Sequence, residues 1–295
     1  MSHNRQSDPY IDLETRIADW APTFSDIRAI VAYGSRALPG NSFDEFSDLD
    51  LVLFTADPDR YVEDSDWLGA IAEIWLAVLE QTGAGDPEWF VVYAGGLKVD
   101  IILSLVESDA EFIQFLDTSP YKRAFARGMR VIYHAPELAL SRSAQAPELA
   151  VSALPTEIDL EKCVNSSLIR VVKAAMLLGR GELIRSLSVL DCGVRTKLLA
   201  LLELHARATK DTDIDIWYCS RFLDQWADPD ALATLVKTYS HYDAREIRQA
   251  LLMSTELISR LAADTARARG YRFPTEGQRR TLAWLTQLLH DQGGH

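Results

Sequence analysis

The sequence has few cysteines, and they are widely spaced. Its 295 residues include only three, Cys163, Cys192 and Cys219, and no two of them form a CxxC pair. A disulfide framework or a cysteine-based zinc site is therefore not supported. The six histidines are scattered and show no HxxxH spacing. We expect a protein of a reducing compartment.

Long apolar runs are also missing. No segment reaches the roughly 20 apolar residues that a membrane-spanning helix needs. The start of the chain, MSHNRQSDPY, lacks the apolar core of a secretion signal. With 48% hydrophobic and 25% charged residues the composition is that of an ordinary globular protein, long enough for two domains. We therefore expect a cytoplasmic protein without membrane contact, either monomeric or homodimeric.

Basic residues are scarce in the first half of the chain. Residues 1–136 carry 10 Lys and Arg against 23 Asp and Glu, whereas residues 137–295 carry 20 of each. Proteins that bind nucleic acid normally show a basic stripe, so the charge argues against a polynucleotide partner. An acidic half would instead attract a cationic small molecule, although acidic surfaces also simply keep proteins in solution.

The most informative stretch spans residues 29–55, AIVAYGSRALPGNSFDEFSDLDLVLFT. An apolar run that ends at Gly34-Ser35 predicts a buried strand followed by a turn whose N–H groups could bind phosphate oxygens. After the loop, Asp48 and Asp50 open a second apolar run and share one face of a predicted strand. Paired carboxylates repel unless a cation lies between them, and Mg²⁺ favours such ligands. Asp-x-Asp alone is also common at strand starts without metal.

A third acid lies in the run LKVDIILSL, which covers residues 97–105. Gly95-Gly96 predicts a hairpin between this strand and one at 88–94. Asp100 stands alone in the apolar run, and burying it without a partner would cost several kcal/mol. Two interpretations stay open: Lys98 on the same strand face pairs with it, or Asp100 joins Asp48 and Asp50 in one carboxylate cluster.

The remaining periodicity predicts a mixed-sheet α/β (α+β) domain followed by an all-α helical bundle. In residues 1–136 we expect further helices at 8–20, 66–82 and near 108–126, and a last strand at 129–133. Residues 137–156 lack clear periodicity and are the predicted linker. In residues 157–295 we expect helices over 157–178, 182–208, 243–269 and 276–290, and one more that opens at Asp228-Pro229.

These motifs together resemble a known family. The stretches YGSRALPG and FSDLDLVLF resemble the signature of nucleotidyltransferases of the DNA polymerase β superfamily. With GGLKVDIILSL, LVKTYSHYDAREIRQAL and RGYRFP they resemble the aminoglycoside 6-adenylyltransferases, the streptomycin adenylyltransferase family, over most of the chain. The resemblance implies a nucleotidyltransferase domain plus a helical domain, with ATP and Mg²⁺ as cofactors and a cationic aminoglycoside as acceptor.

The resemblance also implies roles for single residues. It makes Gly34 and Ser35 the triphosphate-binding turn, Asp48 and Asp50 Mg²⁺ ligands, and Asp100 the third acid, which ligates metal or takes the acceptor's proton. Arg36 would touch phosphate, and so would Lys173 from the helical domain, where a solvated helix lysine is the alternative. The chain departs from the family at Asn165-Ser166, where related enzymes tend to have Asn-Glu, and at Ser220-Arg221-Phe222, where Gly-Lys before an aromatic is expected. The departures put the acceptor in doubt.

We therefore predict transfer of AMP from ATP to a hydroxyl of an aminoglycoside such as streptomycin, giving antibiotic resistance. Three alternatives remain. The acceptor could be another small molecule or a protein hydroxyl. The chain could combine a nucleotidyltransferase with a helical RNase domain as a toxin–antitoxin partner, but no arginine of residues 157–295 has a histidine at the Arg-x₄₋₆-His spacing of such domains. It could also be a non-catalytic nucleotide-binding sensor.

Overall fold

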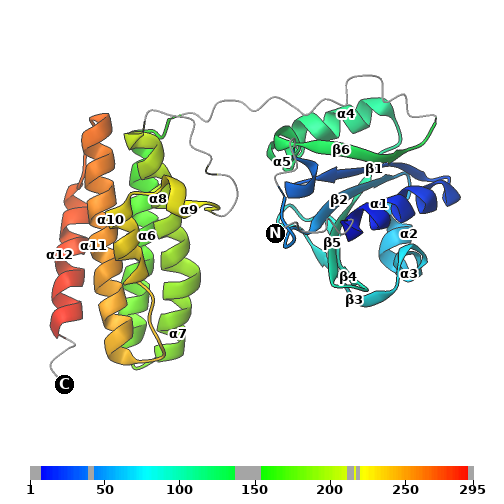
Figure 1. Cartoon of the computed structure of the whole chain (residues 1–295). Coiled ribbons are helices and arrows are strands. Elements are labelled where there is room, and N and C mark those ends of the chain that lie inside the picture. The colour runs from blue at the N-terminus through cyan, green and yellow to red at the C-terminus, as the bar shows by residue number, and fades with distance from the viewer. Residues whose placement is uncertain (1–7, 39–42, 137–153, 211–215, 217–219, 292–295) are drawn as a thin grey trace, which may run out of the picture. The chain divides into compact units, whose positions relative to one another are not determined.

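The computed structural model describes residues 8–38, 43–136, 154–210, 216 and 220–291. The chain divides into two compact units, Met1–Val151 and Ser152–His295. Figure 1 shows a sheet with helices in the first unit and helices in the second. The predicted domain bounds, 1–136 and 157–295, stay a prediction, and most of the predicted linker at 137–156 lies outside the described residues.

The first unit is built on a six-stranded mixed sheet with the strand order β3-β4-β5-β2-β1-β6. The strands are β1 (Ile27–Tyr33), β2 (Leu49–Thr55), β3 (Ile74–Gln81), β4 (Pro87–Tyr93), β5 (Leu97–Leu105) and β6 (Met129–His134). β2 and β5 are parallel neighbours, and the other neighbouring pairs are antiparallel. The two strands that carry Asp50 and Asp100 therefore lie side by side in the middle of the sheet.

Helices cover both faces of this sheet (Figure 1). One face packs against α1 (Pro9–Trp20), α2 (Pro58–Glu63) and α3 (Asp66–Ile71), and the other against α4 (Asp109–Thr118) and α5 (Lys122–Arg127). Alternate residues of β2 point to opposite cores: Leu51 and Leu53 to the first, Val52 and Phe54 to the second. Because both faces are covered, the strand reads as a continuous apolar run.

The predicted helix over 66–82 is wrong in its second half. The helix α3 ends at Ile71, and residues 74–81 form β3, the edge strand, paired antiparallel with β4. Ala, Leu and Glu in IWLAVLEQ favour a helix locally, but the tight turn closed by Thr82 and Asp86 (N to O, 2.9 Å) returns the chain onto β4. Tertiary pairing thus overrides a weak local preference. The predicted helix near 108–126 is two helices, α4 and α5, separated around Ser119-Pro120.

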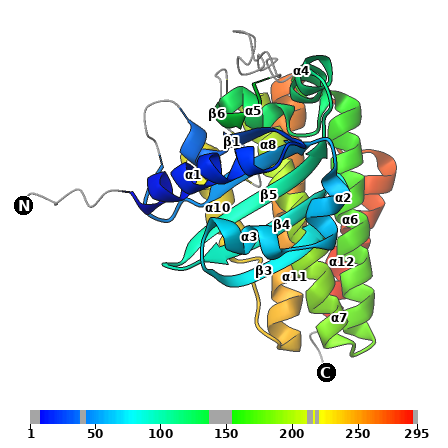
Figure 2. The ribbon, with the colours of Figure 1, turned by 90° about the vertical axis from the view of Figure 1, so that its right-hand side faces the viewer.

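The second unit is all helical in its described part, which confirms the predicted class. Its helices are α6 (Glu157–Gly179), α7 (Leu183–Ser188), α8 (Arg195–Thr209), α9 (Leu223–Trp226), α10 (Pro229–Val236), α11 (Ala244–Arg269) and α12 (Glu276–Asp291), with a π-helical turn at Val189–Val194. The two long helices α6 and α11 pack against each other and against α8 (Figures 1 and 2). A capping box of Thr156 and Asp159 starts α6.

None of the helices in the described residues is long and apolar enough to cross a membrane.

Candidate active site

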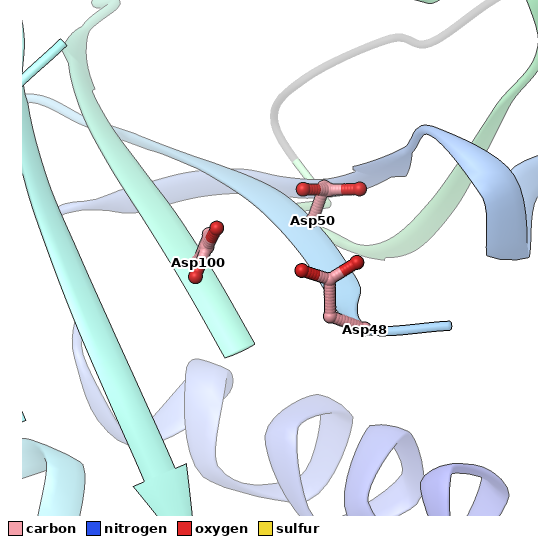
Figure 3. Close-up of side chains that lie close together, drawn as sticks. All are labelled: Asp48, Asp50 and Asp100. Atoms are coloured by element: carbon pink, nitrogen blue, oxygen red, sulfur yellow. The ribbon is translucent and has the colours of Figure 1, made fainter. Parts of the chain in front are cut away.

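Three carboxylates converge at the start of the two central parallel strands (Figure 3). Asp48 lies just before β2, Asp50 is in β2, and Asp100 is in β5 directly opposite Asp50 in the strand register. One carboxylate oxygen of each residue lies within 4.8 Å of the others. Asp100 is buried, whereas the other two are partly exposed. The structure thus brings together the three acids that the sequence singled out; their roles stay a prediction.

Lys98 contacts two of these three acids. Its Nζ lies 2.6 Å from Asp48 Oδ2 and 2.8 Å from Asp100 Oδ2. The sequence left open whether Asp100 pairs with Lys98 or joins the other acids, and the structure shows both arrangements at once. The second oxygen of Asp100, Oδ1, is buried and has no hydrogen-bond partner within the described part of the chain.

Burial and mutual repulsion perturb the acids. Burial, and then the charges of Asp48 and Asp100, raise the pKa of Asp50 to about 7. Burial likewise raises the pKa of Asp100, although its hydrogen bond to Lys98 acts in the opposite direction. For Lys98, burial alone would lower the pKa, but the hydrogen bonds to Asp100 and Asp48 outweigh it and raise the value. The cluster therefore carries more negative charge than one ammonium group balances.

Gly34 positions the carboxylate of Asp50. Its φ of +74° lies in the left-handed region, and a methyl group added there would come within 2.2 Å of Asp50 Oδ2. Only glycine fits this close approach without strain. The sequence suggested Gly34 because it allows close backbone approach to phosphate; the structure adds that it makes room for the acid next to the turn.

The three acids fit a divalent cation. They supply hard oxygen donors of the kind that Mg²⁺ prefers, close enough together to share one ion. The buried and unpartnered Asp100 Oδ1 is an acceptor that the described part of the protein leaves unsatisfied. Burial, and then the negative charges of Asp48 and Asp100, raise the pKa of Asp50, so an added positive charge would be favoured there. Asp48, Asp50 and Asp100 are therefore the residues that could hold such an ion.

The turn after β1 carries two further predicted residues. Ser35 is partly buried and begins a 3₁₀ turn over Ser35–Ala37. Arg36 is buried, and its guanidinium donates to Asp8 Oδ2 (2.6 Å) and to the Ser47 carbonyl (2.8 Å) while it stacks on the Tyr10 ring. These contacts make Arg36 a clamp between α1, the turn and the loop before β2. A phosphate contact for it stays a prediction.

Lys173 belongs to the second unit. It lies exposed on α6, and a contact with the triphosphate stays a prediction for it. On the same helix, Ser166 lines a cleft of about 430 Å³ against α8, together with the charged side chains of Lys162, Lys197, Glu203 and Arg207. Ser166 accepts a hydrogen bond from Arg170 at 2.6 Å. The position where the family tends to have Glu therefore faces a hollow surface of the helical unit.

Sequence reasoning missed Glu88 in β4. It is partly buried, and burial followed by the charge of Asp100 raises its pKa. Its strand neighbour two residues on, Phe90, pairs with Asp100, so Glu88 lies on the same face of the sheet as the acids. The alternation of EWFVVY contained this signal, but the partner register was needed to use it.

The chain is similar to known proteins over nearly its whole length. The family model described as streptomycin adenylyltransferase matches residues 11–288. No curated protein matches the chain. Among solved structures, an aminoglycoside 6-adenyltransferase from Bacillus subtilis aligns with 96% of this chain and 98% of its own, at 14% identity and a TM-score of 0.44. A nucleotidyltransferase-like protein from Exiguobacterium sibiricum aligns with 96% of this chain and 88% of its own, at 15% identity and a TM-score of 0.32.

Proposed function

Because the chain belongs to the streptomycin adenylyltransferase family, whose model covers residues 11–288, we propose that it transfers AMP from ATP to a hydroxyl group of an aminoglycoside such as streptomycin. The observation that carries this proposal is the convergence of Asp48, Asp50 and Asp100, with their oxygens within 4.8 Å of one another. Membership of the family makes the protein a nucleotidyltransferase; the cofactor, the acceptor and the roles of single residues are the proposal.

Asp48, Asp50 and Asp100 would hold Mg²⁺. A metal bound there would lower the pKa of the attacking hydroxyl and offset the charge that develops on pyrophosphate. The protein's own contribution is to hold the three oxygens in place. The backbone hydrogen bonds of the β2–β5 pair fix Asp50 opposite Asp100, and Gly34 gives Asp50 the space it occupies. Positioning of this kind supplies much of the catalysis in phosphoryl and nucleotidyl transfer.

The transfer forms one bond to the α-phosphorus and breaks another. The acceptor oxygen bonds to the phosphorus, the bond to the β-phosphate oxygen breaks, and pyrophosphate leaves. The acceptor's proton goes to a carboxylate of the site or to water. The turn at Gly34-Ser35, with backbone N–H groups and a hydroxyl, would bind the triphosphate oxygens.

The charge of the first unit suits a cationic acceptor. Residues 1–136 carry 23 acidic against 10 basic side chains. Such an excess concentrates cations near the first unit, so a cationic acceptor would be steered toward it by charge. Aminoglycosides are polycations, which agrees with this distribution. A second candidate, transfer to a different small-molecule hydroxyl, is favoured by Ser166 at the position where related enzymes tend to have Glu.

Mass spectrometry tests the proposal directly. The protein is incubated with ATP, Mg²⁺ and one acceptor at a time: streptomycin, other aminoglycosides or a lincosamide. Mass spectrometry then gives the masses of the products, and pyrophosphate release is measured in parallel. We expect a gain of one adenylyl group on an aminoglycoside, and a loss of turnover of at least about a hundredfold in Asp48→Asn. Asp117→Asn, which changes an exposed acid of α4, serves as the control. Addition of an adenylyl group to the lincosamide alone would favour the second candidate, transfer to a different small-molecule hydroxyl. No adenylyl addition to any acceptor would refute the proposed activity.

A further inference from the structure

Lys98 holds an unusual position among the three acids. Its Nζ bridges Asp48 Oδ2 (2.6 Å), just before β2, and Asp100 Oδ2 (2.8 Å), in β5. It comes from the same strand face as Asp100, two residues earlier. The ammonium therefore lies where a cation shared by these acids would be coordinated.

The backbone of Lys98 is fixed, whereas its side chain can leave. The Lys98 N–H donates to the Tyr10 hydroxyl (3.1 Å), and this hydroxyl donates to the Lys98 carbonyl (3.3 Å). The side chain is 46% exposed. A lysine ammonium is strongly hydrated and sits on a flexible four-carbon stem. A half-exposed lysine can thus exchange its two carboxylates for water or for another anion without moving the strand.

The charges make the bridge replaceable. Three carboxylates face one ammonium, and Asp100 Oδ1 has no hydrogen-bond partner in the described ranges. A divalent cation neutralises more of this charge than an ammonium and can use the unpartnered oxygen. Lysine and metal compete for the same oxygens of Asp48 and Asp100, so the lysine weakens binding of the metal alone.

We propose that the Lys98 ammonium occupies, in the metal-free protein, the place between Asp48 and Asp100 that a divalent cation takes, and that it moves to a nucleotide phosphate when metal and nucleotide bind together. The competition for the carboxylates stands on the geometry alone; the move to a phosphate rests on the proposed function. Lys98 acts as a positioning residue: it keeps the acids together before the metal arrives and links metal binding to nucleotide binding.

Direct binding of Mn²⁺ to the full-length protein tests the competition, with electron paramagnetic resonance counting the free ion. We expect the Kd for Mn²⁺ without nucleotide to fall at least about tenfold in Lys98→Met, since a neighbouring positive charge repels a divalent ion strongly even at an effective dielectric constant of about 20. Lys98→Arg keeps the charge and should bind Mn²⁺ as weakly as wild type. Lys122→Met is the matched control: its side chain is 43% exposed and lies 3.9 Å from Asp117.

Binding of the Mn²⁺ complex of α,β-methylene-ATP, an analogue that cannot transfer AMP, tests the proposed move of the Lys98 ammonium to a nucleotide phosphate. In Lys98→Met it should weaken by about tenfold, because a charge-assisted contact to phosphate is lost. Opposite changes for the bare metal and for the metal–nucleotide complex are a signature that general damage to the fold does not produce. Circular dichroism confirms that the variant is folded; Lys98→Gln replaces it if it is not.

The outcomes separate the two proposals. If wild type binds Mn²⁺ and folded Lys98→Met binds it no more tightly, the inference about Lys98 is overturned while the proposed function stands. If wild type binds no Mn²⁺ even in the presence of the nucleotide analogue, the proposed metal-dependent activity itself fails.

Discussion

Replacement of Asp50 by asparagine should make the metal-free protein more stable while it removes turnover. Burial, and then the charges of Asp48 and Asp100, raise the pKa of Asp50 from 3.8 to about 7. Between about pH 4 and pH 7 the folded protein therefore keeps a proton on Asp50 that the unfolded chain releases. Stability falls as the pH rises through this window, and above about pH 7 the full cost of the buried charge is present. Asp50→Asn removes this cost.

The size of the effect follows from the shift. One pKa unit corresponds to about 1.4 kcal/mol, which gives an upper limit of about 4 kcal/mol at pH 8. Because Asp50 is only partly buried, solvent screens the repulsion and we expect about 2 kcal/mol. For a domain of this size each kcal/mol raises the midpoint of thermal unfolding by about 2–4 °C, so the first unit of Asp50→Asn should melt about 4–8 °C higher.

Differential scanning calorimetry with a chelator present, at pH 5 and pH 8, measures this difference. At pH 5 the gap in unfolding free energy between Asp50→Asn and wild type should narrow to roughly a third of its value at pH 8, because folded wild type then keeps the proton of Asp50, which the unfolded chain has already released. Added Mg²⁺ at pH 8 should stabilise wild type but not the variant. Asp117→Asn, at an exposed position of α4, should show no such pH dependence. A variant that is no more stable than wild type at pH 8, or equally stabilised at both pH values, would refute the electrostatic reasoning.

Two further predictions concern the turn and the helical unit. Gly34→Ala should lose about 2–3 kcal/mol of unfolding free energy in urea and most of its turnover, because the added methyl meets Asp50 Oδ2 at a positive φ. The control Gly96→Ala, at a similar φ but in open space, should lose only about 1 kcal/mol. Equal losses of stability in the two variants would argue against a role for the contact with Asp50. Ser166→Glu should raise the rate of streptomycin adenylylation in the mass assay with little change in stability, since the new carboxylate can pair with Arg170 one turn away; an unchanged rate would show that this position does not set the acceptor.

The acids could be predicted because they depend on local patterns. Strand alternation puts Asp48 and Asp50 on one face, and a glycine pair marks the hairpin that turns the chain into β5. Both glycines, Gly95 and Gly96, have positive φ as this turn requires. What alternation could not supply was the register that places Asp100 opposite Asp50. The sequence could predict the strand that carries Asp100, but not the register of that strand against β2.

Other features depend on contacts between distant residues. The residues at 74–81 favour a helix by their local propensity. They form a strand because they pair with β4, and the sequence alone does not show this pairing. The clamp made by Arg36 needs Asp8, which lies 28 residues earlier in the chain. The bridge made by Lys98 needs Asp48, 50 residues away. In each case the residue type was visible, but its partner was fixed only by the packed sheet.

The fold holds the acids together against their own repulsion. Asp50 and Asp100 are opposite partners in the β2–β5 pair, so the sheet's hydrogen bonds also fix the two carboxylates. The strands cannot slip to relieve the repulsion, because a shift by one residue would turn Leu51 and Leu53 out of the core that they fill. One ammonium, that of Lys98, offsets part of the charge and leaves the rest. A fold that keeps this excess of negative charge at one end of its central strands has a place for a further cation. A gain in stability from Asp50→Asn and tighter metal binding in Lys98→Met should therefore occur together, because both result from the same uncompensated negative charge.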